Sequence, residues 1–371
     1  MDSRVEIISE PQGDFLRRWF RPLLEQGSTF CAPNLNTQFA FLRTPQVELP
    51  LTFNEAEWGN SWICSPWTQY ISYALQEISW MVPPWQGKLA AGIFHALGQW
   101  LRRADFNRVV MVNNWLLSTA PWPQWSAEEL PEVLAALIRQ WPDHAILFRS
   151  LNKHESGPLI RALRLAGACL IPSRQIWWFA PDSEDVARSR DYRSDVRLLH
   201  KKDLERVDHD ELQPGDFPAL KDLYDQLYLK KYSLHNPQFT TNWLQYAHAE
   251  RLLQFTALRQ ASGKWAGVEA CAEIHGTLTS PIVGYDSCQP KELGLYRRLA
   301  VLPVIEGRRR GLSLNLSAGV GKYKALRGGK ADMEYLAVFH HHLPSVRRRP
   351  WWMVQWISDH LLAPVVKRKQ L

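Results

Sequence analysis

The stretch RLLQFTALRQASGKWAGVEACAEIHGTLTSPIVGYD, residues 251–286, decides the fold. It holds three apolar runs of strand type: Leu252–Leu258, Trp265–Ile274 and Leu278–Tyr285. Short turns at Gly263-Lys264 and Gly276-Thr277 separate the runs, and glycine-containing pairs between strands are typical of hairpins. The pattern therefore predicts an antiparallel β-meander.

The residues after the meander predict a helix and two further strands. Apolar spacing favours a helix over Gly294–Glu306, ended by Gly307. A short strand at Leu312–Leu316 leads into the loop Ser317–Lys324, and Met333–Phe339 forms the last strand.

This order of elements resembles the second half of an acyltransferase domain of the GNAT type. The resemblance is carried by Gly284-Tyr285-Asp286, by the helix Gly294–Glu306 and by LSLNLSAGVGKYK at residues 312–324. It is similar to the branch with two GNAT-like halves, which contains the Fem peptidyltransferases and the cellulose-biosynthesis-like acetyltransferases. The match is best from about Leu252 to Phe339, and the first half matches as an order of elements. The resemblance implies an α/β (α+β) fold with two GNAT-like halves, each a mostly antiparallel mixed sheet flanked by helices.

The domain organisation follows from composition along the chain. We expect an irregular N-terminal region with one helix near Asp14–Leu24, and the charged stretch Pro181–Ser194 is the expected loop between the halves. The expected parts are the N-terminal region 1–85 packed on the first half, the first half 86–181, the second, catalytic half 195–340, and a basic Trp-rich tail 345–371.

Length and composition indicate a globular chain. Of the 371 residues, 46% are apolar and 22% are charged, which excludes a disordered protein. The net charge is +7, and Arg308–Arg310, Arg347–Arg349 and Lys367–Lys369 concentrate the excess near the C-terminus. Such a surface favours an acidic partner: a phosphate-bearing donor, a carrier protein, a nucleic acid or anionic lipid.

Cysteine usage and hydropathy indicate the cellular compartment in which the protein is expected. The five cysteines lie far apart without a Cys-x-x-Cys pair, which indicates reduced thiols. No apolar run reaches the roughly eighteen residues of a membrane span, and the N-terminus does not read as a signal peptide. We expect a cytoplasmic protein. The Trp-rich tail is read either as a docking helix that completes the core or as a peripheral contact with the inner membrane.

Four side chains are candidates for proton transfer. Alternation along Trp265–Ile274 puts Glu269, Cys271 and Glu273 on one face, and burial there would raise a carboxyl pKa toward neutrality, as a general base requires. His235 is a second candidate base, and Tyr323 a candidate proton donor to the leaving group.

Two groups of residues are expected to hold the donor. In the loop Ser317–Gly321, Gly319 and Gly321 let backbone amides approach a ligand, and Lys322 adds charge. In extended backbone, Tyr323 would face away from its neighbouring lysines. The Fem resemblance implies that Lys324 belongs to the active centre and binds the donor's reacting end.

The helix that begins near Gly294 offers a second anion seat, with Lys291, Arg297 and Arg298 close to its start. The GNAT resemblance implies that the donor's pyrophosphate lies there, although the second half lacks the usual Arg/Gln-x-x-Gly-x-Gly/Ala signature. The residues expected to contact the substrate are Tyr285, Asp286, Tyr232 and Asn236. His340–His342 have no carboxylate or cysteine at ligand spacing, so no metal is predicted.

Three functions remain open from the sequence. The first is an N-acyltransferase that moves an acyl group, which includes a fatty acyl group, from a coenzyme A or acyl-carrier-protein thioester to an amine of a small metabolite, an amino-acid derivative or a peptide. In this reading acyl-CoA or the carrier protein is a co-substrate and no cofactor is bound permanently. The second is a Fem-like transferase that uses aminoacyl-tRNA. The third is a non-catalytic acyl-binding protein.

Overall fold

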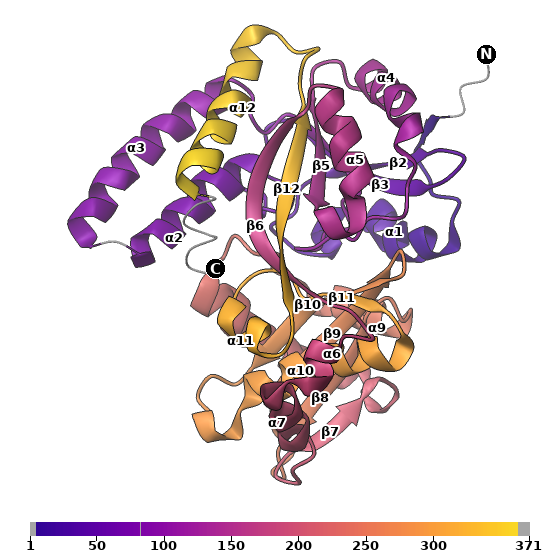
Figure 1. Ribbon diagram of the computed structural model, residues 1–371, viewed down its shortest axis with the longest axis vertical. Helices are drawn as coiled ribbons and strands as arrows, with labels where there is room; N and C mark the ends of the chain where they lie inside the picture. The colour runs from indigo at the N-terminus through magenta and orange to yellow at the C-terminus, as the bar shows by residue number, and fades with distance from the viewer. Residues whose placement is uncertain (1–4, 82, 363–371) are drawn as a thin grey trace. The chain divides into compact units, whose positions relative to one another are not determined.

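A computed structural model describes residues 5–81 and 83–362 of the chain. It contains two compact units (Figure 1). Of the described residues, unit 1 comprises 5–81, 83–173, 235–238 and 334–362, and unit 2 comprises 174–234 and 239–333. The chain passes between the units within two long strands, β6 (Cys169–Phe179) and β12 (Lys330–Phe339).

Unit 1 is built on a mixed sheet whose strands follow the order β1-β2-β3-β4-β5-β12-β6. The first five are β1 (Glu6–Ile8), β2 (Gln38–Arg43), β3 (Glu48–Asn54), β4 (Val109–Val112) and β5 (Ala145–Leu151). Strands β1 to β4 pair antiparallel, β4 and β5 pair parallel, and β5 pairs antiparallel with β12. The region 1–85, for which the sequence predicted one helix, therefore also supplies three strands.

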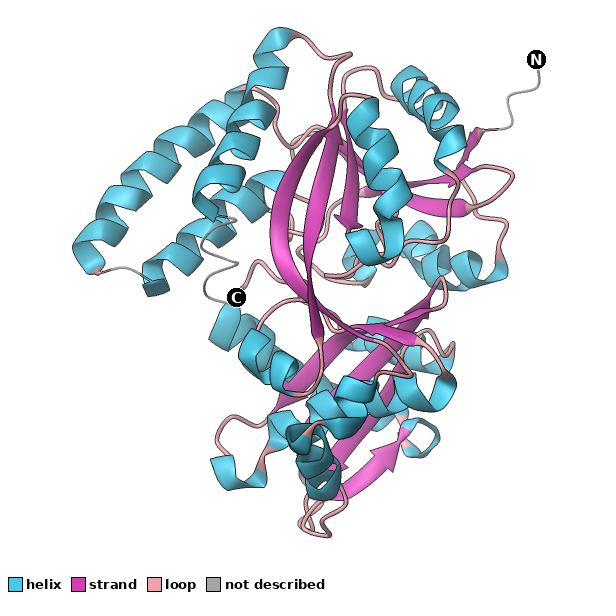
Figure 2. Ribbon diagram, viewed as in Figure 1, coloured by secondary structure: helices cyan, strands magenta, loops and turns pink. Residues whose placement is uncertain are grey.

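Helices cover both faces of this sheet (Figure 2). They are α1 (Asp14–Gln26), α2 (Ala74–Met81), α3 (Pro84–Arg103), α4 (Leu130–Gln140), α5 (Lys153–Leu165) and α12 (Ser345–Ile357). Strand β4 shows why two layers are needed. Val110 and Val112 belong to one apolar cluster with residues of α4 and α5, whereas Val109 and Met111 belong to a second cluster with residues of α3 and α12. A strand buried on both faces reads as a continuous apolar run, as VVMV does.

Unit 2 holds the predicted meander. Its strands follow the order β6-β11-β10-β9-β8-β7, with β7 (Glu205–Asp208), β8 (Gln254–Arg259), β9 (Trp265–Ile274), β10 (Thr277–Tyr285) and β11 (Ser313–Asn315). Strands β7 to β10 pair antiparallel, whereas β10 and β11 run parallel. The meander is confirmed almost residue for residue, because strong alternation and glycine turns fix strand ends locally.

The helices of unit 2 are α6 (Glu184–Arg188), α7 (Arg190–Leu199), α8 (Phe217–Tyr224), α9 (Thr241–Ala249), α10 (Leu295–Arg310) and α11 (Gly321–Leu326). The α8 helix continues into a π-helical turn at Asp225–Tyr232. Helices α8 and α10 both pack on β9 and β10, from opposite faces. An added Cβ at Gly284 of β10 would meet α8, whereas one at Gly267 of β9 would meet Leu299 of α10.

Two local predictions were wrong. The charged stretch 181–194 is not a loop, because Ser183 and Ser189 cap α6 and α7. Residues 321–326 form the helix α11 rather than extended backbone. The predicted opposition of Tyr323 to its neighbouring lysines therefore fails, since successive helical residues point about 100° apart.

No helix within residues 5–81 and 83–362 combines the length and the apolar character needed to cross a bilayer.

The closest backbone approach in unit 2 gives the first prediction. A Cβ at Gly284 would lie 2.4 Å from the backbone nitrogen of Tyr224. This nitrogen cannot easily shift, because it belongs to the backbone of helix α8. Gly284→Ala should therefore lower the free energy of unfolding by about 3 kcal/mol in urea denaturation. Gly215→Ala is the control, because no heavy atom lies within 4 Å of its Cβ position. Equal stability of the two variants would contradict the packing of α8 on β10.

Candidate active site

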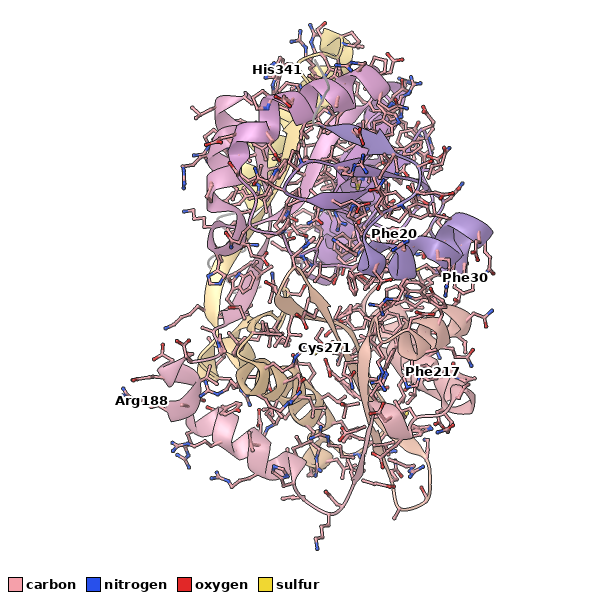
Figure 3. The ribbon with its side chains drawn as sticks, turned by 90° about the vertical axis from the view of Figure 1, so that its right-hand side faces the viewer. Phe20, Phe30, Arg188, Phe217, Cys271 and His341 are labelled. Carbon is pink, nitrogen blue, oxygen red and sulfur yellow. The ribbon has the colours of Figure 1, made fainter. Side chains whose placement is uncertain are left out.

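Glu269 lies on the central strand β9 with only 3% of its surface exposed. Its carboxyl oxygen Oε1 accepts a hydrogen bond of 2.6 Å from the hydroxyl of Ser280 on β10 and one of 3.0 Å from the thiol of Cys271. Cys271 lies two residues further along the same face of β9 (Figure 3). The predicted alignment of these side chains is thus present, and one carboxyl is held inside the unit by neutral donors.

Burial raises the pKa of Glu269 from its ordinary value of 4.5 to about 7. The hydrogen bonds from Ser280 and Cys271 act in the opposite direction, and the negative charge of Glu306 on α10 adds to the rise. Near neutral pH, the carboxyl can therefore both take up and release a proton, which is what a general base or acid does.

Glu273 differs from Glu269 although both lie on one face of β9. Its carboxylate is exposed and forms an ion pair with Arg310 on α10. The face passes from the interior to the surface within four residues. Of the two predicted carboxylates, the structure places only Glu269 in a buried setting.

Strands β10 and β11 separate beside Glu269. They pair from Thr277–Ser313 to Thr279–Asn315, and β10 then shifts register against β9 between Thr279 and Ile282. Among the pairs of the described chain, none joins β10 to β11 beyond Asn315, although β10 continues to Tyr285.

The chain after β11 turns to β6 instead. The N–H of Leu316 donates to the carbonyl of Trp177, and the N–H of Trp177 donates to the carbonyl of Ser317. The separation begins at Ser280, the residue that donates to Glu269. The backbone of β10 beyond this point can therefore pair with an extended ligand on its β11 side.

The side chain of Lys324 holds the glycine loop in place through hydrogen bonds. Its ammonium nitrogen Nζ donates to the carbonyl oxygens of Leu316 at 2.6 Å, Ala318 at 2.8 Å and Ser317 at 3.2 Å. Burial, with the charge of Arg174 added, lowers the pKa of Lys324 to about 7. All three ammonium hydrogens are used within the loop. In this structure Lys324 thus positions the loop rather than offering a hydrogen to a ligand.

The loop that Lys324 holds is strained. Ser317 and Val320 have φ angles of 56° and 46°, and Gly319 has 80°. Gly321 opens α11, and Lys322 is exposed beside it. Non-glycine residues seldom adopt positive φ, so the lysine and its carbonyl partners keep a shape that the loop would not adopt alone.

Tyr323 is bound to a carboxylate that the sequence did not single out. Its hydroxyl donates to Asp195 of α7 at 2.8 Å, and Asp195 also pairs with Arg297 and Arg327. Burial raises the pKa of Tyr323, which keeps the phenol protonated. The amphipathic pattern of RDYRSDVRLL, with Asp195 on its apolar side, is the signal that could have found this residue.

The predicted anion seat at the start of α10 is largely occupied by ion pairs. Arg297 is bound to Asp195 and Ser194, and the fully buried Arg298 donates twice to Asp203 at 2.7 Å. This arrangement disfavours Arg298 as a phosphate ligand. Gly294 has a φ of 58°, and an added Cβ would lie 2.7 Å from Leu198. Lys291 is exposed.

Five tyrosines gather in unit 2, two of them predicted substrate residues. The ring of Tyr296 lies 5.0 Å from that of Tyr323 and 6.4 Å from that of Tyr285. Tyr228 and Tyr232, from the π-helical turn, also act on the pKa of Tyr296, which burial raises. Of these, the sequence missed Tyr296, because it lies inside the helix pattern of α10.

The remaining predicted residues lie elsewhere. Asp286 is a turn residue that accepts from Lys264, Gln289 and the N–H of Cys288, and these contacts lower its pKa to about 2. His235 and Asn236 belong to unit 1. The side chain of Trp62 donates to Asn236 Oδ1 at 3.0 Å, and burial lowers the pKa of His235.

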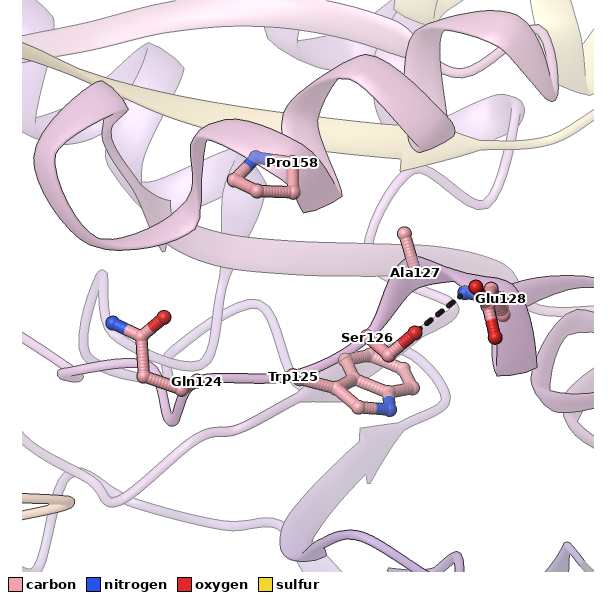
Figure 4. Close-up of a pocket in the computed structure, with 6 residues that line it drawn as sticks. All are labelled: Gln124, Trp125, Ser126, Ala127, Glu128 and Pro158. Atoms are coloured by element: carbon pink, nitrogen blue, oxygen red, sulfur yellow. Dashed lines mark hydrogen bonds between the residues drawn. The ribbon is translucent and has the colours of Figure 1, made fainter.

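Unit 1 has a shallow hollow of its own (Figure 4). It is lined by Gln124, Trp125, Ser126, Ala127, Glu128 and Pro158. None of these residues belongs to the predicted site.

The raised pKa of Glu269 predicts how stability depends on pH. Between about pH 4.5 and pH 7 the native protein keeps a proton at Glu269 that the unfolded chain releases, so native stability falls as the pH rises through this range. Glu269→Gln removes this titration. The free energy of unfolding of the wild type minus that of the variant should decrease from pH 4.5 to pH 7 in urea denaturation. A constant difference would contradict a buried neutral Glu269.

The chain matches no family model and no curated protein. Solved structures resemble it at low identity. FemX superposes over 94% of this chain and 96% of its own, with a TM-score of 0.54 and 8% identity. A tandem GNAT protein from the clavulanic acid biosynthesis pathway covers 92% of this chain and 99% of its own, with a TM-score of 0.43 and 11% identity. L-PGS from Bacillus licheniformis covers 62% and 79%, with a TM-score of 0.46 and 12% identity.

Of these three, FemX has the highest TM-score, and the comparison rests on it. At such low identity the likeness concerns the fold. Its coverage extends over both units, each with the predicted mixed sheet between helices. The predicted two-part α/β architecture is confirmed, and the chain shares the GNAT-like fold of FemX.

Proposed function

We propose that the protein is an N-acyltransferase that moves an acyl group from a thioester to an amine. The observation that carries this proposal is the buried Glu269, with a pKa of about 7, beside the point where β10 and β11 separate. A separated pair of parallel strands offers backbone groups to an extended thioester arm, and the adjacent carboxyl offers a proton acceptor.

The proposed chemistry balances with these groups alone. The acceptor ammonium first loses one proton to solvent, because an ammonium nitrogen has no free electron pair, and Glu269, directly or through a water, then takes a second proton from the attacking amine. The amine nitrogen bonds to the thioester carbonyl carbon. Backbone N–H groups of β10 beyond the register shift stabilise the oxyanion. The C–S bond then breaks, and the leaving thiolate takes up a proton from the protonated Glu269 or from Tyr323.

The charges in unit 2 bear on the donor. Arg297 and Arg298 are engaged with carboxylates, whereas Lys291 and Lys322 are exposed at the starts of neighbouring segments. We assign the phosphate-bearing part of the donor to these two lysines. The lysines fit the phosphates of coenzyme A or of a carrier protein's prosthetic arm. An aminoacyl-tRNA donor would present phosphates to the same groups, so the experiments must separate the donors.

The tyrosine cluster bears on the acceptor. Tyr232 and Tyr285 have part of their surface exposed, and tyrosine faces attract an ammonium group while the hydroxyls form hydrogen bonds with polar substituents. We therefore propose that the acceptor amine approaches over these rings.

The acid–base role of Glu269 predicts a large and specific loss of activity. Glu269→Gln should lower kcat by about a hundredfold or more, because the amide takes up no proton. Glu273→Gln is the matched control on the same strand and face, and it should keep wild-type kcat. Product formation from acyl-CoA and amine panels is measured by mass spectrometry.

The wild-type rate should rise with pH and level off above about pH 7 as Glu269 ionises. Loss of activity in the Glu273 variant alone would contradict the assignment. Product from charged tRNA but from no thioester would favour the aminoacyl-tRNA reading. Binding of acyl thioesters without product from any amine would favour a binding protein.

Substitutions of Lys322 and Lys324 should distinguish donor binding from positioning of the loop. Lys324→Met should lower both the melting temperature and kcat, because three carbonyl oxygens lose their common donor. Lys322→Met should keep the melting temperature and raise the KM for the donor by about tenfold. Thermal unfolding and steady-state kinetics give both quantities. An unchanged donor KM in the Lys322 variant would contradict the assignment of this lysine to the donor.

A further inference from the structure

The outer face of α3 is apolar. Trp85, Leu89 and Ile93 are 66%, 63% and 60% exposed, and their four-residue spacing places them on one side of the helix. Further along the same four-residue series, Leu97 and Leu101 pack, with Phe94, into the cluster shared with α12. The C-terminal half of this apolar stripe is thus buried, whereas the N-terminal half faces outward, where a surface helix normally has polar side chains, so this half of α3 has an unpartnered apolar face.

Helix α12 also has both buried and exposed apolar side chains. Trp351 and Val354 are buried in the cluster that α3 also covers, and the ring of Trp351 lies 4.0 Å from that of Phe106. Trp352 and Trp356 remain 46% and 57% exposed one turn apart. The two helices (Figure 1) thus both contribute to one cluster of unit 1, and each also has exposed apolar side chains. The reading of this segment as a docking helix is confirmed for Trp351, which completes the core, whereas two other tryptophans are exposed.

The charge on these helices has one sign. Neither contains an aspartate or a glutamate, although Asp359 follows shortly after α12. Lys88, Arg103 and Arg349 are exposed. Arg348 lies over the ring of Trp352 at 5.7 Å. Cations beside tryptophan and aliphatic side chains are the composition that suits the boundary between lipid headgroups and acyl chains.

We infer that the outer faces of α3 and α12 bind the surface of an anionic bilayer. Trp85, Leu89 and Ile93 enter the boundary of the acyl chains together with Trp352 and Trp356, and the exposed cations contact lipid phosphates. A protein partner would require directional polar contacts across the interface, about one hydrogen bond per 100–200 Å². These faces offer apolar surface and cations but no carboxylate, which a bilayer accepts without directional partners. The inference goes beyond the transfer chemistry and does not depend on it.

The test uses the full chain and vesicles of phosphatidylcholine with or without phosphatidylglycerol. Flotation should recover the protein with the anionic vesicles, and salt should weaken the recovery because it screens the charges. The triple variant Trp85→Ser, Leu89→Ser, Ile93→Ser should lower the partition coefficient about tenfold or more. The control is Leu24→Ser with Leu165→Ser, two exposed leucines of unit 1 outside these helices, which should bind as the wild type does.

A charge variant keeps the test independent of the apolar substitutions. Lys88→Glu with Arg349→Glu changes only exposed side chains, and it should abolish the preference for anionic vesicles while the circular dichroism spectrum stays unchanged. Equal binding of the triple variant and its control would overturn the inference. So would a dimer in light scattering without lipid that the triple variant converts to a monomer, since the face would then join two copies. Binding of this face to an acidic carrier protein, without binding to vesicles, would also overturn it.

Discussion

The buried carboxylate of Asp195 holds together the part of unit 2 that surrounds the candidate site. It accepts from Arg297 of α10 at 2.6 Å, from the hydroxyl of Tyr323 of α11 at 2.8 Å, and from Arg327 just after α11. The guanidinium of Arg327 also lies 3.4 Å from the ring centre of Tyr323. Asp195 itself is on α7, so one side chain fixes three helices. A buried carboxylate is tolerated in such a place because cations pair with it, and removal of one partner would cost about 3–5 kcal/mol.

Glu269 is buried about as deeply as Asp195, but its hydrogen-bond partners are of a different kind. Its hydrogen-bond donors, Ser280 and Cys271, are neutral, and the charge of the carboxylate Glu306 raises its pKa more than the charge of Arg206 lowers it. Burial raises the pKa of Glu269, which accepts hydrogen bonds from neutral groups, whereas Asp195 is bound by two guanidinium groups. The contrast separates a carboxylate that serves structure from one that can exchange a proton near neutral pH.

The lysines of unit 2 also differ in whether they serve the structure or remain accessible to a ligand. A lysine beside a glycine loop suggests a ligand contact, but its ammonium is spent on three carbonyl oxygens of the loop itself. Lys291 and Lys322 are exposed, and they are the lysines that we propose to contact a phosphate-bearing donor. In unit 1, the same distinction applies to apolar side chains. Helices α3 and α12 each bury some apolar side chains in the core and expose others, and these exposed side chains are the ones that we propose to contact lipid.

The sequence by itself determined the meander, the helix after it and the face shared by Glu269, Cys271 and Glu273, because strand alternation, glycine turns and helix caps act over a few residues. It also indicated that a carboxyl on this face would have a raised pKa if it were buried. It did not find the strands of the first 85 residues, the helix at residues 190–199 or the partner of Tyr323. Only the tertiary structure decided that Glu269 is buried whereas Glu273 reaches Arg310, that Arg298 is spent on Asp203, and that Lys324 serves its own loop. These outcomes depend on which distant segment supplies the partner. The sequence shows that a charged or polar side chain needs a partner. Which residue becomes that partner is decided by contacts between residues some 30 to 130 positions apart.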